Sequence, residues 1–291
     1  MAYAPSLAFC IVAAMLIFRL SKFPIDSSVM QKKIFKKVFL LSMILLIPFS
    51  IKTISRNFLW KDPITLFSHD IPYLKKSVKA NDLMASTLVD ESNKEKNPIK
   101  KEKQLRDAVG YYKTAVANYD EYAIGWNNMG IIYFEHLNEP DSALPCFQKA
   151  LAGDSTLKIA YFNLARCYEV FNDAKNACKF YDKYLKWDST NAKVYSYITK
   201  IYFLNGDFNS AQYYNRLAIQ NAPNSEDPYI DKGYLMMSLR DTVSAIVAFE
   251  TAIEKNSKNP KLCSFLENYF RKKGNTTRAA YYKDLGNKTI K

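Results

Sequence analysis

The apolar residues of this chain follow two patterns. Within the first 51 residues they form two long runs that are almost free of charge, and beyond residue 105 they recur on one face of successive helices. Gly and Pro are few, at 8 and 11 of 291 residues, and no long alternation of β-branched and polar residues occurs. We therefore expect an all-α protein, in which a transmembrane helical hairpin precedes a stack of further helices.

The first apolar run carries no charge from residue 1 to residue 18 and is densest over residues 7–17. About 20 such residues cross a bilayer, so we predict a first span over residues 2–20. The alternative is a cleaved signal peptide, which requires a basic residue before the apolar core. Here the first charge, Arg19, follows the core, and this order favours a retained span.

The second apolar run, residues 38–51, is shorter, but Ile34 and Phe35 extend it and lysines at both ends can snorkel. A buried soluble helix would explain this run taken by itself. Two apolar runs joined by a basic connector favour a transmembrane hairpin over residues 1–55 instead, with the second span over residues 34–53.

The connector carries six basic residues against the single acid Asp26, so by the positive-inside rule it faces the cytoplasm. The rest of the chain then lies in the periplasm if the membrane is a bacterial inner membrane, or in the lumen if it is the endoplasmic reticulum. Residues 56–79 interleave aromatic and aliphatic residues with charges. We predict an interfacial juxtamembrane segment there, with an ordinary linker as the alternative.

Farther along, one aromatic position recurs every 34 or 35 residues. We call these the opening residues; they are Trp126, Tyr161, Tyr195 and Tyr229, and Cys263 holds the same place 34 residues later. Four places after the opening residue, three of the five repeats keep a small residue, namely Gly130, Ala165 and Gly233. A second small residue is kept in all five, at Ala143, Ala177, Ala211, Ala245 and Ala279, with an aromatic residue three or four places later.

This pattern resembles the tetratricopeptide repeat (TPR), in which two antiparallel helices form a hairpin and neighbouring hairpins stack. The small residues let paired helices approach closely, while the aromatic residues wedge between neighbouring hairpins. The resemblance implies an all-α TPR helical-hairpin solenoid over residues 80–291, with about five to six repeats. Within it we expect a mobile polar loop at residues 91–103 and a charged capping helix at residues 276–287.

The net charge of +13 is unevenly distributed. Residues 1–104 carry +9 and residues 255–291 carry +8, whereas residues 105–254 carry −4. A nucleic-acid groove needs clustered basic residues on the folded surface, together with stacking aromatic residues or a base-reading motif. The sequence has no such module, and we expect no nucleic-acid partner.

The sequence contains no recognisable catalytic arrangement. The five cysteines have neither CxxC nor zinc-ligand spacing, and His69 and His136 lie far apart, outside any metal-binding motif. Four of the cysteines fall within predicted helices, where a thiol behaves as a small buried hydrophobic group. We predict no catalytic residue, no cofactor and no metal in this chain, and interpret the acids of the repeats as a solvated face.

The concave face of a TPR stack is formed by first-helix residues one, two and five places after the opening residue. The candidate ligand-binding residues at these places are Asn127, Asn128, Ile131, Phe162, Asn163, Arg166, Tyr197, Lys200, Asp231 and Tyr234. Asn128 and Asn163 occupy equivalent places, and their stacked amides would grip the backbone of an extended peptide. Arg166 and Lys200 would bind its acidic groups. A generic protein-binding groove and simple solvation are the alternatives.

The first residues, AYAPSLAFC, resemble the Tyr-x-Pro-Ser-x-x-Phe-Cys segment of membrane-spanning, TPR-containing glycosyltransferases related to protein O-mannosyltransferases. The residues that resemble the junction between that family's last span and its repeats are Arg56, Asn57, Trp60, Asp62, Leu66 and Phe67. The resemblance implies the C-terminal portion of a polyprenyl-phosphate-sugar transferase, whose catalytic acids belong to an early exoplasmic loop outside the matched segment.

Two functions therefore compete. In the first, the chain is the non-catalytic C-terminal part of a membrane glycosyltransferase, and its TPR arm presents protein acceptors. In the second, it is a self-standing, membrane-anchored TPR scaffold of an envelope or secretory complex. Both predict a protein or an extended peptide in the TPR groove and membrane lipid around residues 1–55.

Overall fold

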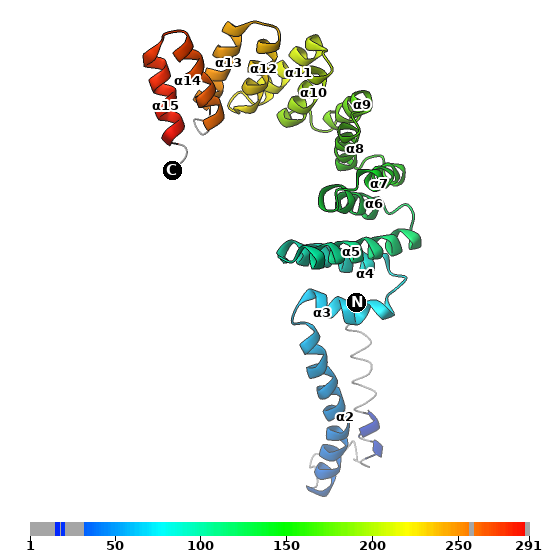
Figure 1. Ribbon diagram of the computed structural model, residues 1–291. Coiled ribbons are helices and arrows are strands. Elements are labelled where there is room, and N and C mark those ends of the chain that lie inside the picture. Colours follow the sequence, from blue (N-terminus) through cyan, green and yellow to red (C-terminus); the bar gives the residue numbers. More distant parts are fainter. Residues whose placement is uncertain (1–14, 18, 21–31, 256–258, 289–291) are drawn as a thin grey trace. The chain divides into compact units, whose positions relative to one another are not determined.

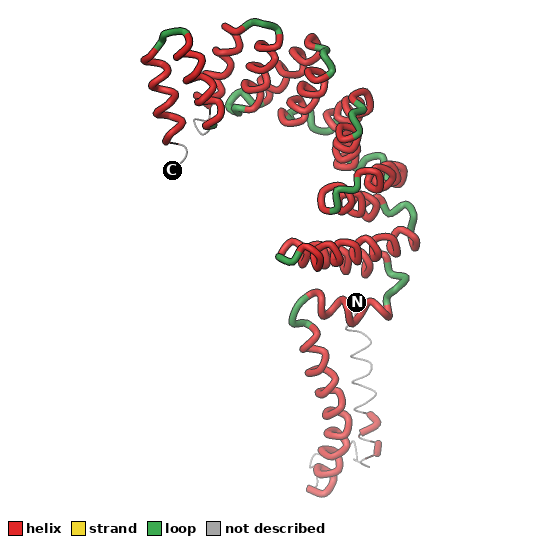
Figure 2. The backbone as a smooth tube through the Cα atoms, in the orientation of Figure 1, coloured by secondary structure: helices red, strands yellow, loops and turns green. Residues whose placement is uncertain are grey.

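The computed structural model describes residues 15–17, 19–20, 32–255 and 259–288, and these residues form helices and loops without a β-strand (Figure 1, Figure 2). The helices, in chain order, are α2 (Lys32–Leu59), α3 (Pro63–Asp70), a 3₁₀ turn (Ile71–Tyr73), α4 (Val78–Lys94), α5 (Pro98–Asn118), α6 (Ala123–Ile131), a π turn (Ile132–His136), α7 (Pro140–Gly153), α8 (Lys158–Val170), α9 (Ala174–Leu185), α10 (Ala192–Leu204), α11 (Phe208–Asn221), α12 (Asp227–Ser238), α13 (Thr242–Lys255), α14 (Pro260–Lys272) and α15 (Thr276–Lys288). The predicted all-α fold is confirmed for this part of the chain.

The chain divides into two compact units, residues 1–75 and residues 76–291. In the first unit, α2 continues past residue 53, where the second span was predicted to end. Its portion Lys36–Leu59 is 24 residues long, and the most apolar stretch has a mean hydropathy of 2.0 with none of it buried, so by length and composition this helix is able to cross a bilayer. The predicted first span, residues 2–20, lies largely outside the described residues.

A proline marks the start of the next helix, α3. The residue before a proline is driven out of the helical conformation, and Asp62, which precedes Pro63, is extended at φ −152° and ψ 156°. Its side chain then caps α3 by accepting a hydrogen bond from Thr65 N at 2.8 Å. The segment predicted to be interfacial, residues 56–79, is therefore mostly helical, and its large exposed rings are those of Phe58, Trp60 and Tyr73.

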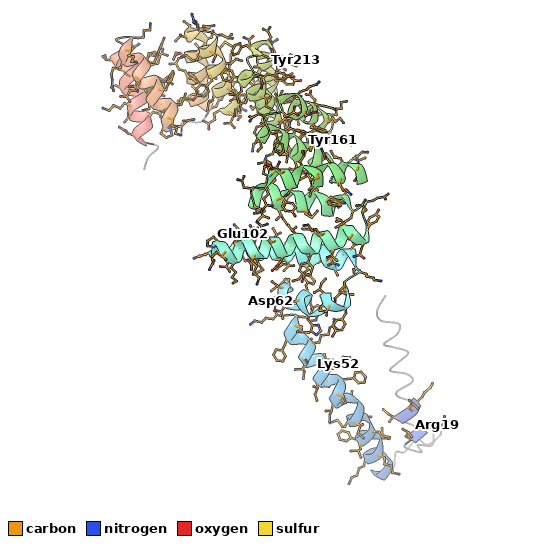
Figure 3. The ribbon with its side chains drawn as sticks, turned by 45° about the vertical axis from the view of Figure 1, so that its right-hand side comes forward. Arg19, Lys52, Asp62, Glu102, Tyr161 and Tyr213 are labelled. Carbon is orange, nitrogen blue, oxygen red and sulfur yellow. The ribbon has the colours of Figure 1, made fainter. Side chains whose placement is uncertain are left out.

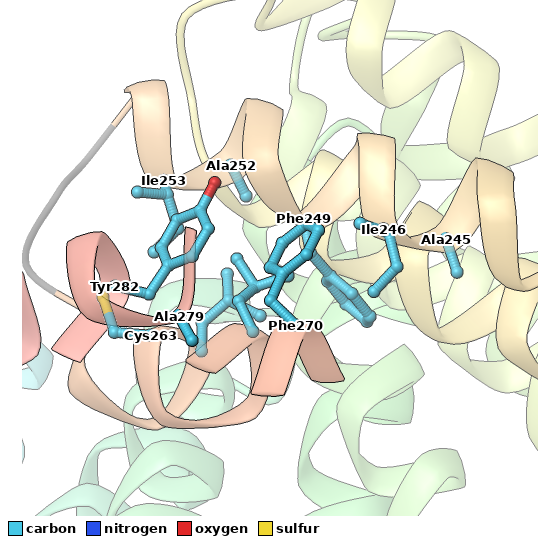
Figure 4. Packing of buried hydrophobic residues seen from close by; sticks show 11 residues of the cluster. Ala245, Ile246, Phe249, Ala252, Ile253, Cys263, Phe270, Ala279 and Tyr282 are labelled. Atoms are coloured by element: carbon cyan, nitrogen blue, oxygen red, sulfur yellow. The ribbon is translucent and has the colours of Figure 1, made fainter. Parts of the chain in front are cut away.

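The described part of the second unit consists of six helical hairpins. These are α4/α5, α6/α7, α8/α9, α10/α11, α12/α13 and α14/α15. The second helix of each hairpin also packs against the first helix of the next one, so neighbouring hairpins share their cores. At the C-terminal end, for example, Phe249 of α13, Phe270 of α14 and Tyr282 of α15 belong to one buried cluster (Figure 4).

Two glycines mark the close contact between the helices of a hairpin. A Cβ added to Gly130 would lie 2.6 Å from Cε1 of Phe147, and one added to Gly233 would lie 2.2 Å from Cε1 of Phe249. Both rings are almost completely buried and have no room to move aside. The small residue four places after the opening residue is thus the seat for an aromatic ring of the second helix.

Each opening aromatic residue binds the loop that precedes its helix. The polar atom of the ring donates a hydrogen bond to the backbone carbonyl six residues earlier, as Tyr161 Oη does to Ser155 O at 3.0 Å (Figure 3 labels Tyr161). The equivalent bonds are Trp126 Nε1 to Asp120 O at 2.7 Å, Tyr195 Oη to Ser189 O at 3.0 Å and Tyr229 Oη to Pro223 O at 3.2 Å. This bond explains why the position holds Trp or Tyr, since Phe has no donor.

The interval of 35 residues between the first two opening residues has a structural cause. Residues Ile132–His136 form a π turn, in which Leu137 N bonds to Ile132 O, five residues back, at 3.0 Å. Such a turn absorbs one additional residue. Each of the five first helices from α6 onwards is then followed by a residue with positive φ, namely Asn138 (54°), Asn172 (56°), Gly206 (77°), Arg240 (62°) and Gly274 (75°).

The prediction of a mobile loop at residues 91–103 is wrong. Helix α4 extends to Lys94 and α5 begins at Pro98, so only residues 95–97 lie outside a helix. Glu and Lys are good helix formers, and the polarity of this stretch marks exposure and not a loop. Asn97 caps α5 by accepting a hydrogen bond from Ile99 N at 3.0 Å.

The glycine seat makes a testable prediction about stability. Gly233→Ala is expected to lower the free energy of unfolding by about 1–3 kcal/mol, the usual cost of overpacking a core. The matched control is Gly110→Ala in α5, because no heavy atom lies within 4 Å of the place that this Cβ would take. The control should raise the free energy of unfolding by about 0.5–1 kcal/mol through helix propensity. Urea unfolding measures both, and a stabilising Gly233→Ala would contradict the ring contact.

Candidate functional site

The ten predicted ligand-binding residues all lie on first helices, in α6, α8, α10 and α12. Their exposure differs: Asn127, Asn163 and Asp231 are buried, Lys200 and Tyr234 are exposed, and the other five are half-buried. The predicted face therefore contains both accessible groups and groups that hold the repeats together.

From α6 to α12, side chains of neighbouring first helices meet in pairs across the seams, which are the lines of contact between one first helix and the next. In every pair, the residue one place after an opening residue meets the residue two places after the next one. The pairs are Asn127 with Asn163, Phe162 with Tyr197, and Ser196 with Asp231. Asn163 Nδ2 donates to Asn127 Oδ1 at 3.0 Å, and the centroids of the two rings lie 6.2 Å apart. Successive seams are thus occupied by amides, by rings, and by a hydroxyl with a carboxyl.

The two asparagines of the predicted amide ladder have other partners in the structure. Asn163 is committed to Asn127, and Asn128 donates to Tyr112 Oη at 3.3 Å. Tyr112 Oη in turn shares a 3.1 Å hydrogen bond with Ser86 Oγ of α4. Residues at equivalent places of two repeats do not face one another. Each seam instead brings the residue one place after an opening residue opposite the residue two places after the next opening residue, so Asn128 and Asn163 form no ladder.

Both predicted cations already face an acid of the solenoid. Arg166 Nη1 lies 2.5 Å from Glu135 Oε1, and its guanidinium lies 5.0 Å from the centroid of the Phe134 ring. Lys200 Nζ lies 3.5 Å from Asp231 Oδ1. The two cationic side chains remain 34% and 55% exposed, so a ligand carboxylate reaches them in competition with the internal acids.

Two acids on this face are held in surroundings that oppose ionisation. Burial raises the pKa of Asp231, and the nearby Lys200 offsets part of the rise. Burial also raises the pKa of Glu169, offset in part by a 2.5 Å hydrogen bond from Tyr181 Oη. Asp231 Oδ2 and Ser196 Oγ are fully enclosed without a hydrogen bond of good geometry. The buried polar atoms between α10 and α12 therefore lack part of their hydrogen bonding.

A cavity of about 200 Å³ opens on the first-helix face of the first two hairpins. Its lining residues are Ser86, Val89, Asp90, Tyr112, Asn128, Ile131, Ile132 and His136. Two of these, Asn128 and Ile131, were predicted from the sequence. The cavity combines three aliphatic side chains with polar groups, namely two hydroxyls, an amide, a carboxyl and an imidazole. It is smaller than the roughly 300–1,000 Å³ of small-molecule and cofactor pockets. It suits one side chain of a peptide.

The sequence reasoning missed several of these residues. Glu135 and Glu169 stand nine and eight places after their opening residues, which are equivalent places once the additional residue of the π turn is counted. The recurrence of a glutamate at this place in two successive repeats was the signal in the sequence that could have identified them. Ser86 and Tyr112 were missed because the α4/α5 hairpin lacks an aromatic opening residue.

Three of the buried thiols are poorly suited to nucleophilic chemistry. Burial raises the pKa of the Cys146 and Cys178 thiols to about 11 and that of Cys167 to about 12, so these thiols are protonated at neutral pH and are poor nucleophiles. Within the part of the chain that the structure describes, no group of three or more His, Cys, Asp or Glu side chains is placed to hold a metal ion.

The buried carboxyl of Asp231 makes a prediction about pH. Because its folded-state pKa lies above the ordinary value of 3.8, the unfolded chain releases this proton first, and the carboxyl lowers stability as the pH rises past that value. The Asp231→Asn variant has no carboxyl at this place and does not undergo this pH-dependent loss of stability. Its free energy of unfolding relative to the wild-type protein should therefore increase from about pH 4 to pH 7. Urea unfolding across this range measures the difference, with the exposed Asp107→Asn as control; a difference that is independent of pH would contradict the assignment.

Comparison with known proteins agrees with the repeat architecture. The family described as "Tetratricopeptide repeat" matches residues 159–191, which contain most of the α8/α9 hairpin. No curated protein sequence matches the chain. Among solved structures, MamA is 19% identical, over 55% of this chain and 93% of its own, with a TM-score of 0.51. YrrB, a TPR protein with an unusual peptide-binding site, is 15% identical over 67% of this chain and 94% of its own, with a TM-score of 0.56. Pseudomonas aeruginosa pilF is 22% identical over 58% and 77%, with a TM-score of 0.50.

At these low sequence identities, the similarity to the solved structures supports the fold and nothing beyond it. The recurring opening residues, the glycine seats and the match at residues 159–191 describe the same unit of two helices. The second unit carries tetratricopeptide repeats, and its described residues fold as an all-helical TPR solenoid.

Proposed function

We propose that this chain binds an extended segment of a partner protein along the first-helix face of its solenoid. The observation that carries the proposal is the 200 Å³ cavity next to Asn128 and Ile131. In an extended peptide alternate side chains point to one side. One apolar side chain then enters the cavity, and the half-buried amide of Asn128 lies within reach of the peptide backbone. The peptide-binding site of YrrB, a protein of similar fold, supports this use of the solenoid.

The rest of the face indicates which ligand residues come after the apolar side chain. Beyond the amide seam the ligand meets the half-buried rings of Phe162 and Tyr197, and then the exposed ammonium of Lys200. Rings favour apolar or aromatic side chains, and a cation favours an acid. The preferred ligand is therefore a segment with an aliphatic residue at one end and an acidic residue towards the other.

A selection of random peptides of about twelve residues against the full chain tests this proposal. Enriched peptides should carry an aliphatic side chain, and their affinity should fall about tenfold or more for Asn128→Ala with Ile131→Ala, which removes a hydrogen bond and apolar contact. The control is Val243→Ala with Val247→Ala, two exposed residues of the second helix α13. Fluorescence polarisation measures each affinity. No enrichment, or an equal loss in the control, would contradict the proposal.

We also propose that α2 anchors the chain in a bilayer. The length and mean hydropathy of the helix and its unburied surface support this. The exposed rings of Phe58 and Trp60 at its end, and of Tyr73 farther along the chain, also support it, because such rings favour the headgroup layer. The basic residues in the first turns of α2, together with Arg19 and Lys22 earlier in the chain, support a cytoplasmic connector and a solenoid on the periplasmic or lumenal side.

Lys96 provides the test of sidedness. It is exposed in the short connector between α4 and α5, whereas the described native cysteines are buried. An impermeant maleimide applied to intact cells or sealed vesicles with the exoplasmic face outward should label Lys96→Cys and leave the wild-type protein unlabelled. Labelling only after permeabilisation would reverse the topology, and release of the chain by alkaline carbonate would contradict anchoring.

We further propose that this chain belongs to a membrane glycosyltransferase. The segment AYAPSLAFC and the residues around Trp60 and Asp62, which resemble segments of TPR-containing membrane glycosyltransferases, support this proposal. In this proposal the solenoid presents protein acceptors to a catalytic part encoded upstream. An in-frame multi-span extension with acids in its first outer loop would support it. A ribosome-binding site directly before Met1 would favour the self-standing membrane scaffold.

A further inference from the structure

We infer that a second surface, on the second helix of the third hairpin, binds an acidic segment of a partner protein. This lysine groove is a cavity of about 660 Å³. Its lining includes the four lysines Lys175, Lys179, Lys183 and Lys186 and the two acids Asp182 and Asp207. None of them belongs to the predicted first-helix face, so the inference is independent of the proposed function.

The four lysines of the groove carry positive charge that the solenoid does not neutralise directly. Within the described residues, no carboxylate lies within 4 Å of any of the four ammonium groups. Lys179 Nζ lies 5.7 Å from the centroid of the Phe180 ring, and Lys183 Nζ lies 5.4 Å from the same ring. A cation over a ring is held in place but keeps its charge.

The two acids that line the groove already have partners of their own. Asp182 accepts a hydrogen bond from Tyr214 Oη at 3.2 Å, and burial raises the pKa of this carboxyl, an effect that Lys186 opposes at longer range. Asp207 caps α11, where it accepts hydrogen bonds from Ser210 N at 3.0 Å and from Ser210 Oγ at 2.7 Å. The groove therefore presents more free positive than negative groups, although residues 105–254 as a whole carry −4.

The spacing of the lysines selects an extended occupant. Lys175 and Lys186 are eleven residues apart along α9 and its C-terminal cap, which corresponds to about 16 Å of helix. A single phosphate reaches one or two of the four ammonium groups, whereas about five residues of extended chain cover the whole row. The volume also falls within the roughly 300–1,000 Å³ of binding clefts. An acidic peptide segment matches both the length and the charge.

The aromatic content of the groove argues against a nucleic acid. Single-stranded nucleic acids bind where exposed rings stack on their bases. The ring that lines the groove is Tyr202, which is half-buried and already stacked on Tyr214, with centroids 5.5 Å apart. The groove thus offers charge without a free stacking surface.

The test uses the full chain and three labelled probes. These are a nine-residue peptide of alternating Glu and Ala, the same peptide with Lys in place of Glu, and a nine-nucleotide oligothymidine. Lys179→Gln with Lys183→Gln should weaken binding of the Glu peptide about tenfold, since the change removes two of the four charges that attract the peptide. The control, Lys232→Gln with Lys261→Gln, removes two exposed lysines of α12 and α14 and should change the affinity less than twofold.

Thermal unfolding confirms that both variants are folded before affinities are compared. Asn128→Ala with Ile131→Ala should leave binding of the Glu peptide unchanged, which separates the lysine groove from the first-helix face. Equal losses in the groove variant and its control would reduce the effect to overall charge and overturn the inference. So would a wild-type chain that does not bind the Glu peptide, or one that binds the Lys peptide or the oligothymidine as tightly.

Discussion

The contact between a small residue of one helix and a buried ring of its partner is the constraint on which the second unit depends. At Gly130 and Gly233 the ring occupies the space that a Cβ would take, so the two helices of the hairpin lie as close as their backbones allow. This approach buries only one side of each hairpin. The other side is covered by the neighbouring hairpin, and for this reason a repeat of this kind is stable only within a stack.

Stacking also assembles both candidate surfaces from several repeats. On the first-helix face, amides, rings and a hydroxyl with a carboxyl meet across successive seams, so a ligand along this face contacts the junctions between repeats as well as single helices. Its cations are balanced by internal acids, which favours selectivity over affinity because a ligand acid must replace an existing partner. The lysine groove differs from this face, because its two acids accept hydrogen bonds within the fold and no carboxylate of the described residues lies close to its ammonium groups.

Much of the fold was predictable because its signals are local and repeated. The opening residues at Trp126, Tyr161, Tyr195 and Tyr229 each bind a carbonyl six residues earlier, so the same residue type recurs for the same reason. The helices through residues 91–103 were not predicted, because a polar helix and a polar loop have similar composition. A capping residue such as Asn97 can be recognised only when the ends of the helices are already known. The partners of Asn128 and Asn163 were not predictable from the period either, since the period aligns equivalent residues but does not say which of them face each other.

By itself, the sequence determined the helical hairpin, its period of 34 residues, the small and aromatic places within it, and the apolar helix before the repeats, because each of these depends on residues close together in the chain. The tertiary structure decided which side chains are free. It buried Asn127 against Asn163 and placed Glu135 against Arg166 and Asp231 against Lys200. Among the described residues, it left the lysines of α9 without a close acid. These outcomes depend on how far one hairpin is displaced from the next, and that displacement results from packing across many residues that no local pattern records.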